Sequence, residues 1–298
     1  MSKAIVRSYG SSSEEWRKLQ KHTLKRTYNV DENRIVVSGV SDGGTGAYYI
    51  AMRETTPFAS FLPLNGFVMV LTNEEIDDGR LFPNNLVNKP WFIVNGGQDR
   101  LYPTANVEPF IRHMMNKGVD LTYHARPEAG HNTAWWSEEK YSFEQFVLDH
   151  PRRPHPDTLT WQAADASYNR AHWLIIDKLG AQSDDANDMR DVNIVGESEP
   201  VSKFGFLSLF NTKKASGRID ISRIGNTVQV TTRGVAEFTL LLSPDIFDFR
   251  QPITVLANSR IVFHGAVQRS LETLLKWAAR DNDRTMLYGA ELNIRLSR

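Results

Sequence analysis

This sequence of 298 residues contains no cysteine. Disulfides, thiolate nucleophiles and thiolate metal ligands are therefore excluded, and the redox compartment is left open. Long apolar runs are also absent, since no segment approaches the roughly 18 consecutive apolar residues of a membrane helix. We expect no membrane insertion. No sustained apolar stretch follows Lys3, so we expect no signal peptide in this chain. The chain as it stands would stay in the cytoplasm, although a longer parent could be secreted.

An excess of either charge is missing as well. Lysine and arginine total 35, aspartate and glutamate total 35, and the formal net charge is +0. A neutral chain has no electrostatic means of capturing nucleic acid or an anionic membrane, so we expect neither as a partner. Hydrophobic residues make up 41% and charged residues 23%, which suffices for a sizeable core. The composition predicts a globular protein.

The first half of the chain alternates between strand and helix patterns. This alternation predicts βαβ units with a parallel sheet. The strand candidates are Arg34–Ser38, Phe58–Leu64, Trp91–Val94 and Leu121–Ala125, and the helix candidates are Ser13–Thr27, Gly44–Arg53, Asn106–Asn116 and Ser137–Asp149.

The segment from His150 to Pro156 ends this alternation, because its three prolines can continue neither a helix nor a central strand. Beyond it the apolar period becomes 2, with turns at Ile224-Gly225-Asn226 and Asn258-Ser259 and one helix at Ser270–Arg280. We predict an α/β domain over residues 1–150 and an all-β, sandwich-like domain over residues 151–298. The expected strands are 159–162, 172–177, 204–210, 218–223, 227–232, 238–242, 253–257, 260–263 and 291–296. The acidic stretch from Ser183 to Asp191 lacks the spacing of a calcium loop, and we predict no metal site.

The most informative motif is Gly39-Val40-Ser41-Asp42-Gly43-Gly44. It follows the apolar run Ile35-Val36-Val37 and precedes a helix pattern, so it has the strand-turn-helix context of a nucleophile elbow. We expect the glycines at 39 and 43 to let the turn close without clashes. An ordinary tight turn with an incidental serine is the alternative reading.

A serine nucleophile needs a base that an acid orients, and the chain supplies both in the order Ser, Asp, His. Asp99 follows the strand candidate Trp91–Val94, and His131 follows Leu121–Ala125. Parallel strands bring such residues to one edge of the sheet. Loop capping for Asp99 and a structural role for His131 remain open. Of the other candidates, His124 lies inside a strand pattern and Asp120 precedes its strand.

Residues 29–150 resemble the second half of a bacterial α/β-hydrolase of the phospholipase/carboxylesterase and dienelactone-hydrolase-like group. The matching segments are 33–44, 96–103 and 129–131. The resemblance implies that Ser41 is the nucleophile, His131 the general base and acid, and Asp99 the residue that orients the imidazole. It also implies hydrolysis of carboxylic esters through an acyl-enzyme, without a cofactor, and a small-molecule ester as substrate.

One departure from that family concerns the oxyanion hole. Only 34 residues precede Ile35, which leaves room for one strand, near Ala4-Ile5-Val6. In this fold an upstream loop carries half of the oxyanion hole, and we find no His-Gly-Gly-Gly-type motif for it before Ser41, so the backbone N–H of Asp42 is the one donor that we can name. We therefore expect a partial hydrolase sheet with an exposed central edge, which favours a homodimer.

Three aromatic residues lie close to the expected triad in sequence. Tyr102 follows Asp99, and Trp135 and Trp136 follow His131. They are candidates for a substrate pocket, since such pockets are mostly apolar. Packing between this loop and the second domain is the alternative. For the chain as a whole, we predict a serine esterase. The other hypothesis is a non-catalytic module that binds a glycan or a protein and carries a relic hydrolase half.

Overall fold

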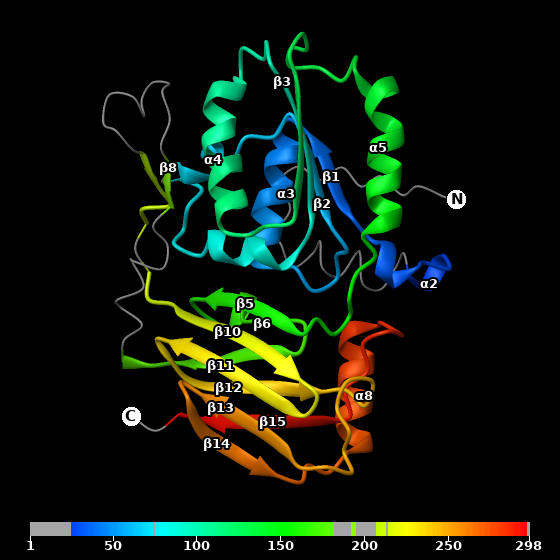
Figure 1. The fold of residues 1–298 in the computed structure, drawn as a ribbon, viewed down its shortest axis with the longest axis vertical. Helices are drawn as coiled ribbons and strands as arrows, with labels where there is room; N and C mark the ends of the chain where they lie inside the picture. Colours follow the sequence, from blue (N-terminus) through cyan, green and yellow to red (C-terminus); the bar gives the residue numbers. More distant parts are fainter. Residues whose placement is uncertain (1–24, 74, 182–191, 195–206, 213, 297–298) are drawn as a thin grey trace.

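The structure is a computed structural model that describes residues 25–73, 75–181, 192–194, 207–212 and 214–296. Figure 1 shows a parallel sheet with its helices stacked on a group of largely antiparallel sheets. The chain therefore has a mixed α/β fold. Three expected features lie outside the described residues: the strand at residues 4–6, the part of the Ser13–Thr27 helix that precedes Lys25, and the acidic stretch from Ser183 to Asp191.

The first part of the chain forms a four-stranded parallel sheet in the order β1-β2-β3-β4. These strands are β1 (Val37–Val40), β2 (Phe61–Leu64), β3 (Trp91–Gly96) and β4 (Leu121–Arg126). Every residue of β2 and β3 is buried, as expected for strands that are covered on both faces. In the described part of the chain β1 pairs with β2 alone and lies at an edge.

Three helices cover this sheet: α3 (Asp42–Arg53), α4 (Thr104–Asn116) and α5 (Trp136–Asp149). Figure 1 shows α3 and α4 on one face and α5 on the other. One core cluster joins α3 and α4 to the sheet through Tyr48, Phe110 and Trp91. A second cluster joins α5 to the opposite face through Phe146 and Phe92. The predicted βαβ units of this part are therefore confirmed.

The first strand lies further along the chain than the sequence predicts. It covers Val37–Val40, whereas we expected Arg34–Ser38. The Asp31 carboxylate accepts a hydrogen bond from the Asn33 amide and starts a 3-10 turn, η2 (Glu32–Arg34), which occupies the expected start of the strand. The second strand begins at Phe61 rather than Phe58, because the Phe58 amide closes a turn onto the Thr55 carbonyl.

The second part of the chain contains two larger sheets that share one core. Their strand orders are β14-β13-β11-β10-β5 and β15-β12-β7-β6. Alternate residues of both sheets, with Trp161, Trp173 and Trp277, belong to one cluster of buried residues. The strands are β5 (Thr158–Ala163), β6 (Arg170–Ala171), β7 (Leu174–Leu179), β10 (Gly217–Ile224), β11 (Thr227–Arg233), β12 (Val235–Leu242), β13 (Ile253–Ala257), β14 (Arg260–Gly265) and β15 (Ala290–Arg295).

Both predicted turns of this part are confirmed. Gly225, with φ 57°, joins the antiparallel strands β10 and β11. Asn258 and Ser259, with φ 49° and 67°, join β13 and β14. Two successive residues with positive φ are what a two-residue hairpin needs. The predicted helix is α8 (Leu271–Asp281), and the Ser270 side chain caps its start by accepting from the Thr273 amide.

The remaining elements are short. They are α2 (Lys25–Thr27), η3 (Val68–Thr72), η4 (Pro83–Asn88), η5 (Ala166–Tyr168), β8 (Val192–Ile194) and β9 (Leu207–Leu209), and β8 pairs with β9. No helix among the described residues is long and apolar enough to span a membrane.

Candidate active site

Ser41 sits at a sharp turn between β1 and α3. Its φ of 58° and ψ of −120° are a conformation that non-glycine residues rarely adopt. The turn is so tight that a Cβ on Gly39 would lie 2.4 Å from the backbone carbon of Gly43. Position 39 therefore needs glycine, as the sequence predicts. The local geometry is that of a strained strand-to-helix elbow.

The second glycine that the elbow needs is Gly44, not Gly43. A Cβ on Gly43 would meet nothing within 4 Å, so our expectation for that position was wrong. A Cβ on Gly44 would lie 2.9 Å from the Cα of Gly66, in the loop that follows β2. The reason is tertiary: the start of α3 packs directly on this loop, and the Thr45 hydroxyl accepts a hydrogen bond from the Phe67 amide.

His131 lies between the other two predicted residues. Its Nε2 is 2.7 Å from the Ser41 Oγ, and its Nδ1 is 2.6 Å from the Asp99 Oδ2. The three residues follow β1, β3 and β4, whose carboxyl ends meet at one edge of the sheet. The structure thus brings Ser41, Asp99 and His131 into one hydrogen-bonded chain.

The Asp99 carboxylate is held on both of its oxygens. Oδ2 contacts His131, and Oδ1 accepts hydrogen bonds from the amides of Leu101 and Tyr102 at 2.8 and 2.9 Å. Its side chain is 0% exposed, so these contacts fix its orientation away from solvent. Because the carboxylate can only accept, the His131 Nδ1 carries the shared proton and Nε2 is free to accept from Ser41.

Asn65 lies at the same end of the sheet. From the sequence, Asn65-Gly66 could be a loop on the substrate side or a simple turn, and we favoured the turn. It is 0% exposed and has a φ of 47°. Its Nδ2 donates to the Asn132 carbonyl at 2.9 Å, and its Oδ1 accepts from the Gly96 amide at 3.1 Å. Asn65 therefore ties the end of β2 to the end of β3 and to the loop of His131. Its position in an Asn-Gly pair directly after a strand was the available signal.

Tyr102 lies against the hydrogen-bonded group of Ser41, His131 and Asp99. Its ring lies edge-on to the His131 ring, with centroids 5.1 Å apart. Its hydroxyl donates to the Asp42 Oδ1 at 3.3 Å. Burial raises the pKa of the Tyr102 phenol, and the Asp42 carboxylate raises it further, so the hydroxyl keeps its proton at neutral pH. The structure places this predicted pocket residue beside the site.

The two tryptophans lie elsewhere. Trp135 is 5% exposed and belongs to the core between α5 and the sheet, with Leu62 and Phe92. Trp136 starts α5 and packs edge-on against Phe143, with ring centroids 5.2 Å apart. Both therefore pack between α5 and the sheet of their own half, rather than between the loop and the second part of the chain. The two tryptophans that follow His131 in the sequence therefore pack with the apolar side of α5.

The other two candidates from the sequence, His124 and Asp120, lie away from Ser41. His124 and Arg126 of β4 bind the buried Glu139 of α5, with the His124 Nδ1 2.8 Å from the carboxylate. Asp120 precedes β4 and lies at the opposite end of the sheet from Ser41. Among the described residues, no group of three or more histidine, aspartate or glutamate side chains could hold a metal ion.

No protein-family model and no curated protein matches this chain. Solved structures that match part of it include esterase PE8, at 17% identity over 42% of this chain and 54% of that protein, with a TM-score of 0.33. An S-formylglutathione hydrolase from Agrobacterium tumefaciens matches at 19% identity over 47% and 56% of the two chains, with a TM-score of 0.37. FrmB from Staphylococcus aureus, another S-formylglutathione hydrolase, matches at 18% over 45% and 58%, with a TM-score of 0.34. The match spans little more than half the length of these hydrolases.

Proposed function

We propose that this chain is a serine hydrolase that cleaves carboxylic esters through an acyl-enzyme. The observation that carries the proposal is the pair of hydrogen bonds on His131, 2.7 Å to the Ser41 Oγ and 2.6 Å to the Asp99 Oδ2. A nucleophile, a base and an orienting carboxylate in this arrangement are the parts that acyl transfer requires.

The proposed reaction uses all three residues. The Ser41 Oγ attacks the ester carbonyl carbon while the His131 Nε2 takes its proton. The imidazolium is stabilised by the buried Asp99 and returns the proton to the leaving alcohol. Water then attacks the acyl-enzyme by the same path, with His131 again as base, and releases the carboxylic acid.

The negative oxygen of the tetrahedral intermediate needs donors on the other side of Ser41. The backbone N–H of Asp42 is the first of α3, and the Thr45 amide is the one that closes the first turn onto the Ser41 carbonyl. The amide of Asp42 is therefore free to serve as a donor, at the positive end of the helix dipole. One oxyanion donor typically contributes about 2.7–4 kcal/mol of transition-state stabilisation.

The domain organisation belongs to the same proposal. Residues 1–150 would form a hydrolase-like catalytic domain whose described strands correspond to the second half of such a sheet. Residues 151–298 would form a β-sandwich, built from the two sheets that share a core. Tyr102 would line the substrate side of His131, because its ring contacts the imidazole.

Labelling with a fluorophosphonate probe tests the proposal directly. The probe is expected to modify Ser41 of the folded protein, as located by peptide mass spectrometry, and the Ser41→Ala variant should not react. Ser38→Ala is the matched control, because Ser38 lies on β1 and binds the Leu62 carbonyl. A wild-type protein that stays unlabelled, or a Ser41→Ala protein that labels equally well, would overturn the catalytic role.

A further inference from the structure

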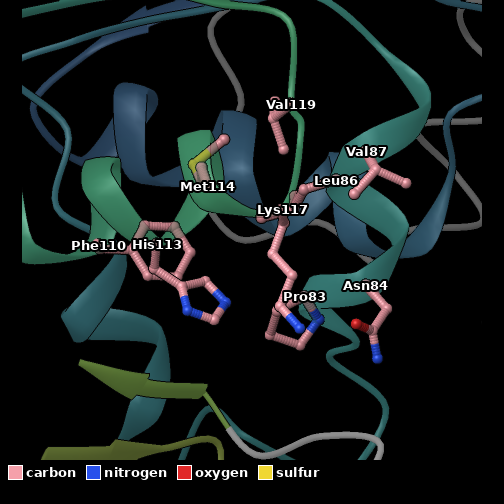
Figure 2. Close-up of a pocket in the computed structure, with 9 residues that line it drawn as sticks. All are labelled: Pro83, Asn84, Leu86, Val87, Phe110, His113, Met114, Lys117 and Val119. Atoms are coloured by element: carbon pink, nitrogen blue, oxygen red, sulfur yellow. The ribbon is translucent and has the colours of Figure 1, made fainter.

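Two hollows lie on the side of the parallel sheet away from Ser41. The first is a cavity between η4 and α4, which Figure 2 shows with Phe110, Met114 and Pro83 around it. Its volume of about 10 Å³ is that of a single water, so it can hold no larger ligand. The second hollow is a groove of about 550 Å³, which lies in the range of small-molecule sites.

This groove runs between the two parts of the chain. One wall carries Pro90 and Asp120, which precede β3 and β4 and so mark the amino ends of the parallel strands. The other wall is the outer face of β5, β10 and β11. Ser41 follows the carboxyl end of β1. The groove and the Ser41 site therefore lie at opposite ends of the parallel strands.

The strand wall is polar. The register places Asp220 of β10 between Thr160 of β5 and Thr231 of β11. Ser222, two residues further along β10, lies between Thr158 and Gln229. All six side chains alternate with core residues and line the groove. The wall thus offers hydroxyl, amide and carboxylate groups to a polar ligand.

Lys89 is one of the residues that line this groove, and it differs from an ordinary lysine. It lines the groove but is only 6% exposed, and its amine has neither a hydrogen bond nor an ion pair with any residue that the structure describes. Burial lowers the pKa of the Lys89 amine well below its ordinary value, and the nearby Arg152 guanidinium lowers it further.

The groups around Lys89 do not supply a counter-ion. Arg152 binds the buried Asp283 at 2.8 Å, so that carboxylate already has a partner. His172 is 0% exposed. Burial lowers the pKa of His172 well below the ordinary value, and the charge of Lys89 lowers it further.

The charged residues of the groove surface already have partners or face solvent. On the strand wall, Asp220 binds Arg218 at 2.8 Å. Asp120 is 72% exposed to solvent. Arg153, exposed at the rim, adds a positive charge.

We propose that Lys89 is a nucleophilic amine, and that the groove admits a small polar aldehyde or ketone that condenses with it. The nitrogen lone pair attacks the carbonyl carbon, and a proton moves from nitrogen to oxygen to give a carbinolamine. Loss of water then leaves an imine, and hydrolysis of the imine reverses both steps. A desolvated lysine beside another cation is the usual arrangement for this chemistry. The proposal does not depend on Ser41.

Reductive trapping tests it on the intact chain. The protein is treated with limiting glycolaldehyde and cyanoborohydride at pH 7.5, and the alkylation rate of each lysine is followed by peptide mass spectrometry. Exposed Lys117, at the end of α4, is the comparison. At this pH roughly one in a thousand ordinary lysines is unprotonated, and each unit by which a pKa falls raises that fraction tenfold. We expect Lys89 to react at least about 10 times faster than Lys117.

If Lys89 has only a structural role, its alkylation should be slower than that of Lys117, because burial shields the amine. An alkylation rate at or below that of Lys117 would therefore overturn the proposal. The Lys89→Met variant should lose the fast adduct and keep the slow ones at unchanged rates, with an unchanged circular dichroism spectrum. Repeating the experiment with acetaldehyde, which lacks the hydroxyl of glycolaldehyde, tests the role of the polar wall. If the ratio of the Lys89 rate to the Lys117 rate is the same with both aldehydes, the groove does not select polar carbonyl compounds.

Discussion

The side chain of Asn85 pairs with the backbone of Gln162 as a neighbouring strand would. Its Oδ1 accepts from the Gln162 amide at 2.8 Å, and its Nδ2 donates to the Gln162 carbonyl at 3.0 Å. Asn88, three residues later on η4, makes the same two bonds to Thr160. Because β5 is an edge strand, these two amides cover backbone groups that would otherwise be open to another chain. They also join the two parts of the protein.

The first prediction follows from this pairing. Asn85 is 1% exposed and also donates to the Met52 carbonyl, so Asn85→Ala leaves several buried backbone groups without partners. We expect a loss of about 2–3 kcal/mol in the free energy of unfolding, measured by urea denaturation. Asn84→Ala is the matched control, since the Asn84 Nδ2 donates to the side-chain Oε1 of Gln162 at 3.1 Å rather than to its backbone, and this variant should lose less than about 1 kcal/mol. Equal losses in the two variants would contradict the pairing argument.

A second prediction concerns acid stability. Burial alone would raise the pKa of the Asp283 carboxyl, but Arg152 and Lys25 outweigh it, and the pKa lies below its ordinary value. A lowered pKa in the folded state adds stability that is complete above the ordinary pKa of about 3.9 and is lost as the pH falls through the folded pKa. Asp283→Asn should therefore destabilise the protein at pH 7 and approach the wild type at low pH. Urea denaturation of both proteins over a pH series measures this difference, and a constant difference would refute it.

The sequence was sufficient for much of the fold because its signals are local. The apolar runs of β2 and β3, the elbow motif and the turn residues Gly225 and Asn258 each act over a few neighbours. Ser41, Asp99 and His131 could be selected because each follows a recognisable strand. The roles of Asn65 and Gly44 could not, because their partners are distant in the sequence: Asn65 binds residues 31 and 67 positions away. Nothing near residue 85 reveals that its amide pairs with β5.

The elbow gives a third prediction, with a matched pair of variants. Gly39→Ala would place a Cβ 2.4 Å from the Gly43 backbone, so the turn must open, and we expect a loss of about 1–3 kcal/mol. Gly43→Ala meets nothing within 4 Å and lies in the first turn of α3, where alanine should add up to about 1 kcal/mol. Thermal unfolding of both variants tests the contrast. The reverse order of stability would show that the elbow is not closed by Gly39.

Tyr102 permits a fourth prediction about the substrate side of His131. Tyr102→Phe removes the hydroxyl bound to Asp42 and keeps the ring against the imidazole. Tyr102→Ala removes both. If the ring lines the site, the alanine variant should raise KM for a p-nitrophenyl ester by roughly 10-fold or more, while phenylalanine changes it by less than about 3-fold. A larger effect from the phenylalanine variant would assign the role to the hydroxyl instead.

The fifth prediction tests how Asp99 acts. In Asp99→Asn the amide oxygen can still accept from the Leu101 and Tyr102 amides, so the loop should keep its shape. The amide nitrogen, however, donates to the His131 Nδ1 and moves the ring proton to Nε2, which can then no longer accept from the Ser41 Oγ. Loss of the correct tautomer lowers kcat by about 10⁴ in serine proteases, and we expect a fall of roughly 10³–10⁴ here. Hydrolysis of p-nitrophenyl acetate measures kcat, and the rate of fluorophosphonate labelling should fall in parallel. Turnover within about 10-fold of the wild type, in a folded variant, would mean that Asp99 only caps its loop and that Ser41 is activated without it.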